Sequence, residues 1–376
     1  MLFSILNSRV WNRPVAKCDV HSACEEAGRE SALSMAALER SRTVLALDVG
    51  GTKLAAGLVS EGGELLESLR EPTRLDTGPQ GVTRQLVALA HRLLERSALP
   101  VVGVGVGCGG PLDTALGLIK SPPNLPGWTD YPLTRRLEEA LQLPVWLDND
   151  ANAAALAEFS FGAGRGCREM VYLTISTGIG GGLILGGHLY TGKSGNAGEL
   201  GHIQVVYDGE RCNCGGQGCL EQYASGSSIA RRARQLAAEH PESLLWQLEP
   251  DPAGITAHTI LRALEAGDVV VRGFWDQTIQ YLAAGVSSVV HTFDPQRVVI
   301  GGGITNFGEW LFGPLRQQVA RRTMPPLWQG VEIVPAELGD QVGVYGAAAV
   351  ALRHLEAGLA GARPPGEAPP APGRFS

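Results

Sequence analysis

Three cysteines, Cys212, Cys214 and Cys219, lie within eight residues of the chain, in the glycine-rich stretch RCNCGGQGCLEQYASG. Cysteine thiolates bind zinc, and the glycines between them allow a short loop to wrap around a small ion. A structural zinc site takes four ligands, and the nearest histidine is His202, upstream of the loop. The spacing therefore predicts a Cys3His zinc site. A redox thiol pair and inert buried cysteines are the alternatives that these residues leave open.

The start of the chain and its net charge bear on its compartment and its partners. The opening residues MLFSILNSRVWNRPVAKC contain too short an apolar stretch for a secretory signal, and no run of about 18 uncharged apolar residues occurs elsewhere. We therefore expect a cytoplasmic protein, in which clustered cysteines hold metal more often than they form disulfides. The formal charge of −7 gives no general attraction to nucleic acid or to anionic membranes, so neither is an expected partner.

A second chemical motif is the glycine turn that follows an apolar strand at Asp48. Glycine amides can approach a phosphate closely, a threonine hydroxyl can donate to it, and an aspartate on the same turn suits water-mediated Mg²⁺ binding. A similar turn occurs at STGIGGG, and the GGG run at 301–303 would let an adenosine lie against the backbone. The predicted nucleotide ligands are Asp48, Gly50, Gly51, Thr52, Lys53, Thr177, Gly178, Gly180, Gly302 and Gly303.

The two glycine turns occupy equivalent places in an internal repeat. TVLALDVGGTKLAAGLVS, from Thr43, and MVYLTISTGIGGGLIL, from Met170, share the order strand, glycine turn, strand. Further along, VVGVGVGCGG matches VVIGGGI, and LPVWLDND matches VEIVPAELGD. Apolar runs that end in glycine or acid indicate buried strands whose carboxyl ends face a ligand crevice. The repeat predicts an α/β protein with two similar lobes facing one cleft, against the plainer alternative of two unrelated α/β domains.

Two other glycine motifs match phosphate-binding patterns by letter only. GHLYTGKS, at 187–194, matches GxxxxGKS, and Gly105, Gly107 and Gly110 match GxGxxG. Such motifs bind phosphate when a helix follows, because its N-terminal amides then face the anion. The residues that follow, SGNAGELGH and PLDTALG, show no helical periodicity. We therefore expect neither motif to bind phosphate.

Taken together and in order, the motifs resemble the ROK family of sugar kinases and sugar-responsive repressors. They read LDVGGTK, GVGCGGPLD, LDNDANAAALAE, STGIGGG, GELGH, CNCGGQGCLEQYASG and VVIGGG, and the resemblance covers 43–359. GPLD followed by SPPNLPGW is most similar to the bacterial glucokinases of that family. The resemblance implies a duplicated actin-like ATPase (ribonuclease H-like) fold with two lobes around a nucleotide cleft. It also implies ATP and Mg²⁺ as cofactors, a structural Zn²⁺, a hexose substrate, and a homodimer or homotetramer.

The acidic sequence Asp148, Asn149, Asp150 ends an apolar strand and precedes ANAAALAEF, which has strong helix propensity. A carboxylate at such an edge can accept the proton of a sugar hydroxyl as it attacks the γ-phosphate of ATP. The alternative role for either aspartate is to cap the helix. The resemblance favours Asp150 as the general base, and we expect Asp148 to serve the cap.

An uncharged sugar needs carboxylates and amides that accept and donate hydrogen bonds in fixed directions. Glutamates are most often surface charges, but the family motif favours a sugar-binding role for those at GELGH and CLEQ. The predicted substrate ligands are Asn124, Asn149, Asp150, Glu199, His202 and Glu221. The predicted zinc ligands are His202, Cys212, Cys214 and Cys219. Because Glu199 and Glu221 flank the cysteine loop, the ion is expected to brace the sugar pocket.

The chain is predicted to divide into five parts. Residues 1–42 form a poorly ordered extension, with Met35 as a candidate second start, and are too short and unpatterned for the DNA-binding segment of the repressors. Residues 43–152 form a small α/β lobe, and 153–342 a larger α/β lobe that carries the zinc loop. Residues 343–360 form a helix that packs back on the small lobe. Residues 361–376, rich in proline, glycine and alanine, form a disordered tail.

The predicted function is therefore ATP-dependent phosphorylation of glucose at its 6-hydroxyl, with Asp150 as general base. The first alternative is a kinase for N-acetylmannosamine, N-acetylglucosamine or fructose, which differ from glucose in contacts too fine for unaligned residues. The second is a sugar-sensing ROK regulator without catalytic activity. Intact Asp48, Gly51, Thr52 and Asp150 argue against that second alternative.

Overall fold

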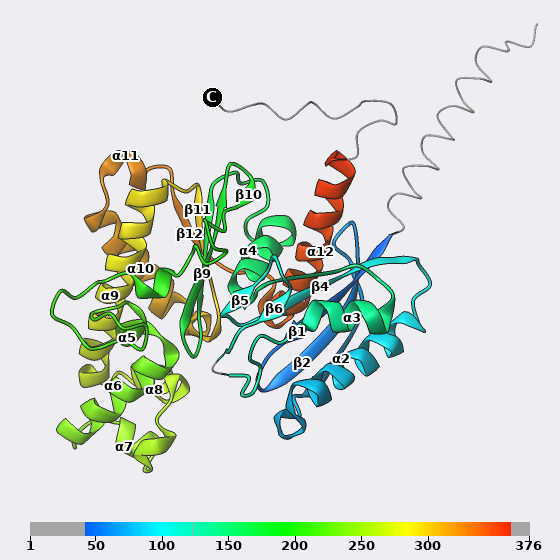
Figure 1. The fold of residues 1–376 in the computed structure, drawn as a ribbon. Coiled ribbons are helices and arrows are strands. Elements are labelled where there is room, and N and C mark those ends of the chain that lie inside the picture. The colour runs from blue at the N-terminus through cyan, green and yellow to red at the C-terminus, as the bar shows by residue number, and fades with distance from the viewer. Residues whose placement is uncertain (1–41, 123, 362–376) are drawn as a thin grey trace, which may run out of the picture.

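The computed structural model describes residues 42–122 and 124–361 of the chain. The predicted N-terminal extension and C-terminal tail lie outside the described residues, apart from Arg42 and Gly361. Within the described part, two mixed sheets with their helices form the two halves of the molecule (Figure 1).

The first sheet has the strand order β3-β2-β1-β4-β7. An antiparallel meander, β1 (Thr43–Val49), β2 (Lys53–Ser60) and β3 (Leu65–Pro72), is followed by the parallel strands β4 (Val101–Cys108) and β7 (Val145–Asn149). β1 is apolar along nearly its whole length because both of its faces are covered. Helices α2 (Gly78–Leu94) and α3 (Leu133–Leu141) pack on one face, and a small hairpin, β5 (Leu112–Asp113) and β6 (Leu118–Ile119), lies beyond β4.

The second sheet repeats the first, with the order β10-β9-β8-β11-β12. Its strands are β8 (Met170–Ile175), β9 (Ile179–Leu185), β10 (His188–Leu189), β11 (Arg297–Gly301) and β12 (Glu332–Pro335). In both sheets a hairpin pairs alongside parallel strands. Every pair of segments matched in the sequence repeat therefore occupies the same place in its sheet, which confirms the duplication and rules out two unrelated domains.

The other helices of the larger half cluster around α9 (Val269–Phe293), as the left side of Figure 1 shows. They bury the apolar core that covers one face of the second sheet. Their bounds are α5 (Glu221–Ala224), α6 (Gly226–Glu239), α7 (Leu245–Leu248), α8 (Ala257–Glu265), α10 (Glu309–Arg322) and α11 (Pro325–Trp328).

Two helices cross between the halves. α4 (Asp150–Phe161) follows the last strand of the first sheet but packs on β8 and β9 of the second. α12 (Val342–Gly361) follows the last strand of the second sheet but packs on β1, β2 and β4 of the first. The two helices also pack against each other between the sheets (Figure 1). Each half is therefore completed by a helix that directly follows the last strand of the other half.

The close packing of α12 explains the glycines of VGVGVG. A Cβ atom at Gly105 would collide with the backbone carbonyl of Ala347 in α12, so only glycine permits this approach. The chain continues from Gly110 into the β5–β6 hairpin, and turns rather than a helix follow GHLYTGKS. Neither motif therefore has the strand–loop–helix context of a phosphate loop.

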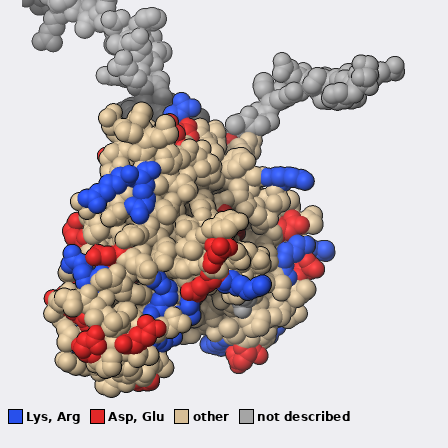
Figure 2. Space-filling model, turned by 90° about the vertical axis from the view of Figure 1, so that its left-hand side faces the viewer, with Lys and Arg blue, Asp and Glu red and all other residues tan. Residues whose placement is uncertain are grey.

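Charges on the surface are mixed. On the face that Figure 2 shows, lysine and arginine side chains alternate with aspartate and glutamate around a central hollow. Among residues 42–122 and 124–361, no helix combines the length and the apolar character needed to cross a bilayer.

Candidate active site

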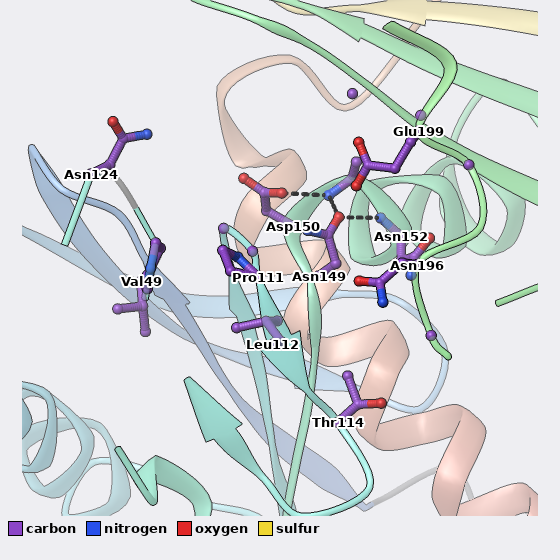
Figure 3. A pocket seen from close by; sticks show the side chains of 18 of the residues that line it. Val49, Pro111, Leu112, Thr114, Asn124, Asn149, Asp150, Asn152, Asn196 and Glu199 are labelled. Carbon is purple, nitrogen blue, oxygen red and sulfur yellow. Dashed lines mark hydrogen bonds between the residues drawn. The ribbon is translucent and has the colours of Figure 1, made fainter. Parts of the chain in front are cut away.

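A cavity of about 500 Å³ lies between the two halves of the molecule (Figure 3). The Gly50–Gly51 turn and the start of α4 form one side, and Gly180 and Gly181, at the start of β9 just after the second glycine turn, form another. The loop 195–199 and the β5–β6 hairpin complete its walls. Every predicted sugar ligand lines this cavity, namely Asn124, Asn149, Asp150, Glu199, His202 and Glu221.

The turn from β7 into α4 positions the acidic motif. Asn149 is the N-cap of α4, and its Oδ1 accepts from the amide nitrogens of Ala151 and Asn152 at 2.9 and 3.4 Å. Asp148 is not the cap, so that expectation is wrong. Its Oδ1 instead accepts from the backbone amide of Asn149 at 2.8 Å and from Nδ2 of Asn152 at 3.0 Å. Asn149 forms the cap because successive side chains of β7 point to opposite faces, which turns Asp148 away from the start of the helix.

Asp150 is the first residue of α4, and it is exposed where it lines the cavity. One carboxylate oxygen, Oδ1, accepts from the amide of Ala151 at 2.9 Å, whereas Oδ2 has no hydrogen-bond donor among the described residues. Burial raises the pKa of Asp150, and the Ala151 amide partly offsets that rise. The free oxygen is therefore a proton acceptor of raised basicity that faces the cavity.

The remaining sugar ligands come from three separate segments. Glu199 and His202 lie at a single 3-10 turn, with Oε2 of Glu199 4.0 Å from Nε2 of His202. Oε2 of Glu221, at the start of α5, accepts from the amide of Ile179 in the second glycine turn at 2.7 Å. Gly51 packs directly on the backbone carbonyl of Asn124, and a Cβ atom there would collide with it.

The predicted nucleotide ligands divide into two groups. Gly50, Gly51 and Gly180 line the cavity. The others lie outside its lining, namely Asp48, Thr52, Lys53, Thr177, Gly178, Gly302 and Gly303. Of these, Gly178 lies against the Glu221 carboxylate, which does line the cavity.

Asp48 lies near the end of β1, beside the first turn of α12. A Cβ atom at Gly343 of that helix would collide with the Asp48 carboxylate. Burial raises the pKa of Asp48 to about 6, with the Lys53 ammonium lowering it and the Asp150 carboxylate raising it. Asp48 and Asp150 therefore interact electrostatically across the same end of the sheet.

The sequence analysis missed several lining residues. Thr114, Leu112 and Pro111 come from the β5–β6 hairpin, and Asn196 comes from the loop before GELGH (Figure 3). Only their position next to recognised motifs could have indicated that these residues line the cavity. Their residue types alone do not indicate a chemical role.

The cysteine cluster has the dimensions of a zinc site. The ligand atoms of His202, Cys212, Cys214 and Cys219 all lie within 4.8 Å of one another. Sγ of Cys214 is 3.7 Å from Sγ of Cys219, and Nδ1 of His202 is 3.6 Å from Sγ of Cys212. Zn–S distances of about 2.3 Å in a tetrahedron separate two sulfurs by roughly 3.8 Å, whereas a disulfide joins them at about 2.05 Å. The donors present therefore fit Zn²⁺ and do not form a disulfide.

His202 faces both sites. Its Nδ1 points to the cysteines, and its Nε2 faces Glu199 beside the cavity. A metal ion on Nδ1 would therefore fix the ring that lines the cavity.

The sequence pattern of the ROK family matches residues 44–354. The chain belongs to the ROK family. A glucokinase of Thermotoga maritima is 38% identical over 307 residues, which cover 82% of this chain and 96% of that protein.

Two solved ROK structures share the fold. A ROK hexokinase from Thermus thermophilus is 37% identical with a TM-score of 0.74, covering 84% of this chain and 99% of its own. A ROK family glucokinase from Streptomyces griseus, in complex with glucose and AMPPNP, is 36% identical with a TM-score of 0.70, covering 83% and 99%. The predicted actin-like ATPase fold is confirmed.

Proposed function

We propose that this ROK protein is a glucokinase that transfers a phosphoryl group from ATP to the 6-hydroxyl of glucose. The observation that carries the proposal is that Asp150 opens into one cavity with Gly50 and Gly51 of the first glycine turn and with Gly180 and Gly181, which follow the second turn at the start of β9. The glucokinase from Thermotoga maritima, and the Streptomyces griseus glucokinase seen with glucose and AMPPNP, support the choice of substrates.

Asp150 acts as the general base. Its free Oδ2 accepts the proton of the sugar 6-hydroxyl as that oxygen attacks the γ-phosphate. The raised pKa suits this role, because a stronger base accepts the proton more readily. Phosphoryl transfer depends mainly on positioning, and the Asn149 cap fixes the backbone that carries Asp150.

The sugar hydroxyls pair with the remaining polar groups of the cavity. The carboxylates of Glu199 and Glu221 accept hydrogen bonds, and the amide groups of Asn124 and Asn149 donate and accept. His202 contributes its Nε2 nitrogen. This set contains no lysine or arginine, which suits an uncharged hexose before transfer.

The glycine turns hold the nucleotide phosphates through backbone amides, and Asp48 holds Mg²⁺ through its waters. When bound, Mg²⁺ neutralises charge on the transferring phosphate. Asp48 must be ionised for this role, and Lys53 favours that form. Thr52, Thr177, Gly302 and Gly303 complete the proposed nucleotide contacts as the lobes close.

His202, Cys212, Cys214 and Cys219 hold a structural Zn²⁺. An ion held there would have four protein ligands, which leaves no position open for substrate and suits a structural role. It fixes the loop that presents His202 and Glu221 to the sugar.

The test is turnover on a panel of sugars, with ATP, ADP and polyphosphate as donors. We expect glucose with ATP to give a kcat/KM at least about tenfold above N-acetylmannosamine, N-acetylglucosamine and fructose. A preference for any of those sugars would contradict the glucose assignment. Binding of sugar without turnover on any of them would favour the sugar-sensing regulator.

Assembly and location remain predictions. A homodimer or homotetramer would be detected by light scattering on the purified protein, and a cytoplasmic location by fractionation of the cells that produce it.

A further inference from the structure

A second cavity, of about 530 Å³, lies along the free edge of β7. The first turn of α3, the loop of the β5–β6 hairpin and the end of α12 form its walls, with a large-lobe residue, Thr191, at one side. Its size falls within the range of small-molecule sites in proteins. Its polar and aromatic lining includes Thr114, Trp146, Asp148, Thr191, Arg353 and His354, and α3 adds Thr134, Arg135 and Glu138.

The carboxylate of Asp148 in this cavity is only half satisfied. The side chain is 8% exposed, and Oδ1 accepts both of its hydrogen bonds. Oδ2 has no donor within hydrogen-bond distance among the described residues, and the guanidinium of Arg353 lies 4.0 Å away. Oδ2 remains accessible from the cavity, so it can accept a hydrogen bond from a bound molecule or from water.

The surrounding groups indicate which molecule fits. The Arg353 side chain is 40% exposed and makes no closer ion pair, and the hydroxyls of Thr114 and Thr191 have no side-chain partner among the described residues. Trp146 and His354 stack with parallel rings, 5.6 Å between centroids, and give the cavity an aromatic wall. A carboxylate, a guanidinium and hydroxyls beside aromatic rings match a ligand with many hydroxyls.

We propose that this cavity is a second hexose site, in which a ring hydroxyl donates to Oδ2 of Asp148 and Arg353 donates to an oxygen of the same ligand. The ligand is the sugar itself or its 6-phosphate, and the choice of a hexose rests on the proposed kinase function. A bare inorganic anion fits less well, because the Asp148 carboxylate would repel it.

The site is connected to the active site through two residues. Thr114 lines both cavities. Asp148 directly precedes Asn149 and Asp150 and bonds to the α4 residue Asn152, so it supports the turn that presents the general base. A ligand here also spans Thr191 of the large lobe and Arg353 of α12, so its affinity depends on how the lobes are closed. Occupancy of the two cavities is therefore linked, and each ligand alters the affinity of the other.

The test is calorimetry without nucleotide, so that no turnover occurs. Glucose is titrated into the free protein, and glucose 6-phosphate into protein held at two saturating glucose concentrations. A second binding event with one ligand per chain is expected. With the 6-phosphate its apparent Kd should not rise with glucose concentration, whereas simple displacement from the active site would raise it in proportion. A second event with glucose alone identifies the sugar as the ligand, and one with the 6-phosphate alone identifies the product.

Two variants test whether this second binding event occurs in the cavity beside β7. Arg353→Met removes the cation. Thr191→Val removes a hydroxyl with little change of shape, so this variant still tests the site if Arg353→Met folds poorly. We expect each to weaken the second event at least about tenfold, and Arg168→Met, an exposed control outside the cavity, to leave it unchanged. Single-site isotherms with both ligands, or a second event equally tight in Arg353→Met and Thr191→Val, would overturn the proposal.

Kinetics separate this proposal from the kinase assignment. Product inhibition against glucose should be mixed in the wild type and purely competitive in Arg353→Met, each compared with its own uninhibited rate. Two binding events without turnover would contradict the kinase and leave the second site standing. Turnover with single-site binding would support the kinase and contradict the second site.

Discussion

Glu221 accepts a 2.7 Å hydrogen bond from the backbone amide of Ile179, and this bond joins the cysteine loop to the second glycine turn. Glu221 follows Cys219 closely in the chain, and Gly178 packs against its carboxylate. A shift of the cysteine loop would therefore move Glu221, a proposed sugar ligand, together with the second glycine turn. The His202–cysteine cluster and the cleft are mechanically coupled.

Loss of one zinc ligand should therefore lower stability and sugar affinity together. We expect Cys214→Ser to lose its zinc, to lower the midpoint of thermal unfolding, and to raise the Kd for glucose at least about tenfold. Zinc content by atomic emission and glucose binding by calorimetry measure these effects. The control is Cys167→Ser, which alters a buried cysteine outside the cluster and should keep its zinc. Unchanged melting and full activity after verified metal loss would rule out a structural role.

Removal of the base should affect chemistry and spare binding. Asp150→Asn keeps the shape of the side chain but cannot take the proton, so we expect kcat to fall at least about a hundredfold with little change in the Kd for glucose. Asp276→Asn, at an exposed aspartate of α9, controls for the loss of one charge. Near-wild-type turnover in Asp150→Asn would refute the assignment of the base.

The raised pKa of Asp48 makes stability depend on pH. Its carboxyl titrates at about 6 in the folded protein against 3.8 in the unfolded chain, so the folded state binds this proton more tightly. The resulting stabilisation is complete below the unfolded value and is lost as the pH rises through the folded one. Asp48→Asn is neutral throughout and escapes that loss, although we expect it to lose kinase activity.

The measurement compares the free energies of urea unfolding of Asp48→Asn and wild type, without Mg²⁺ or nucleotide. The difference should shift in favour of the variant by on the order of 2 kcal/mol between about pH 4.5 and about pH 7.5. Any pH-independent effect of the substitution cancels in this comparison. A difference that stays constant with pH would show that Asp48 is not buried in this way.

Among the acidic residues outside the two cavities, Glu158 should be the one whose substitution lowers the free energy of unfolding most. It is fully buried at the end of α4, and its carboxylate accepts from the backbone amides of Ala163, Glu337 and Leu338 at 2.8, 3.1 and 3.0 Å. Glu158→Gln turns an NH₂ group toward one of those amides, which should reduce the free energy of unfolding by about 3 kcal/mol. The exposed Glu239→Gln is the matched control. A loss no larger than the control's would contradict this role for the carboxylate.

The sequence predicted the sheets well because their information is local. Each strand carries its own apolar run and its own glycine or acid at the end, so the repeat alone placed β1 with β8, β4 with β11 and β7 with β12. The predicted sugar ligands converge for the same reason, since most of them follow strands or recognised motifs.

What the sequence could not predict depends on distant contacts. The direction of the Asp148 side chain is set by Asn152 and by the edge position of β7, so the letters did not show that Asn149 forms the cap. The collision that excludes a side chain at Gly343 involves Asp48, at the other end of the chain. The cavity beside Trp146 likewise combines β7, the β5–β6 hairpin and α12, which no local pattern connects.

The position of α12 sets the order in which the protein can be made. The face of the first sheet formed by Val44, Ala46 and Val59 is covered by Val344, Ala347 and Leu352 of that helix. During translation this apolar surface emerges early and stays bare until almost the whole chain has left the ribosome, an interval on the order of tens of seconds. The nascent N-terminal half is therefore a natural client for a chaperone, and a chain that stops before α12 should aggregate rather than persist as a half-enzyme.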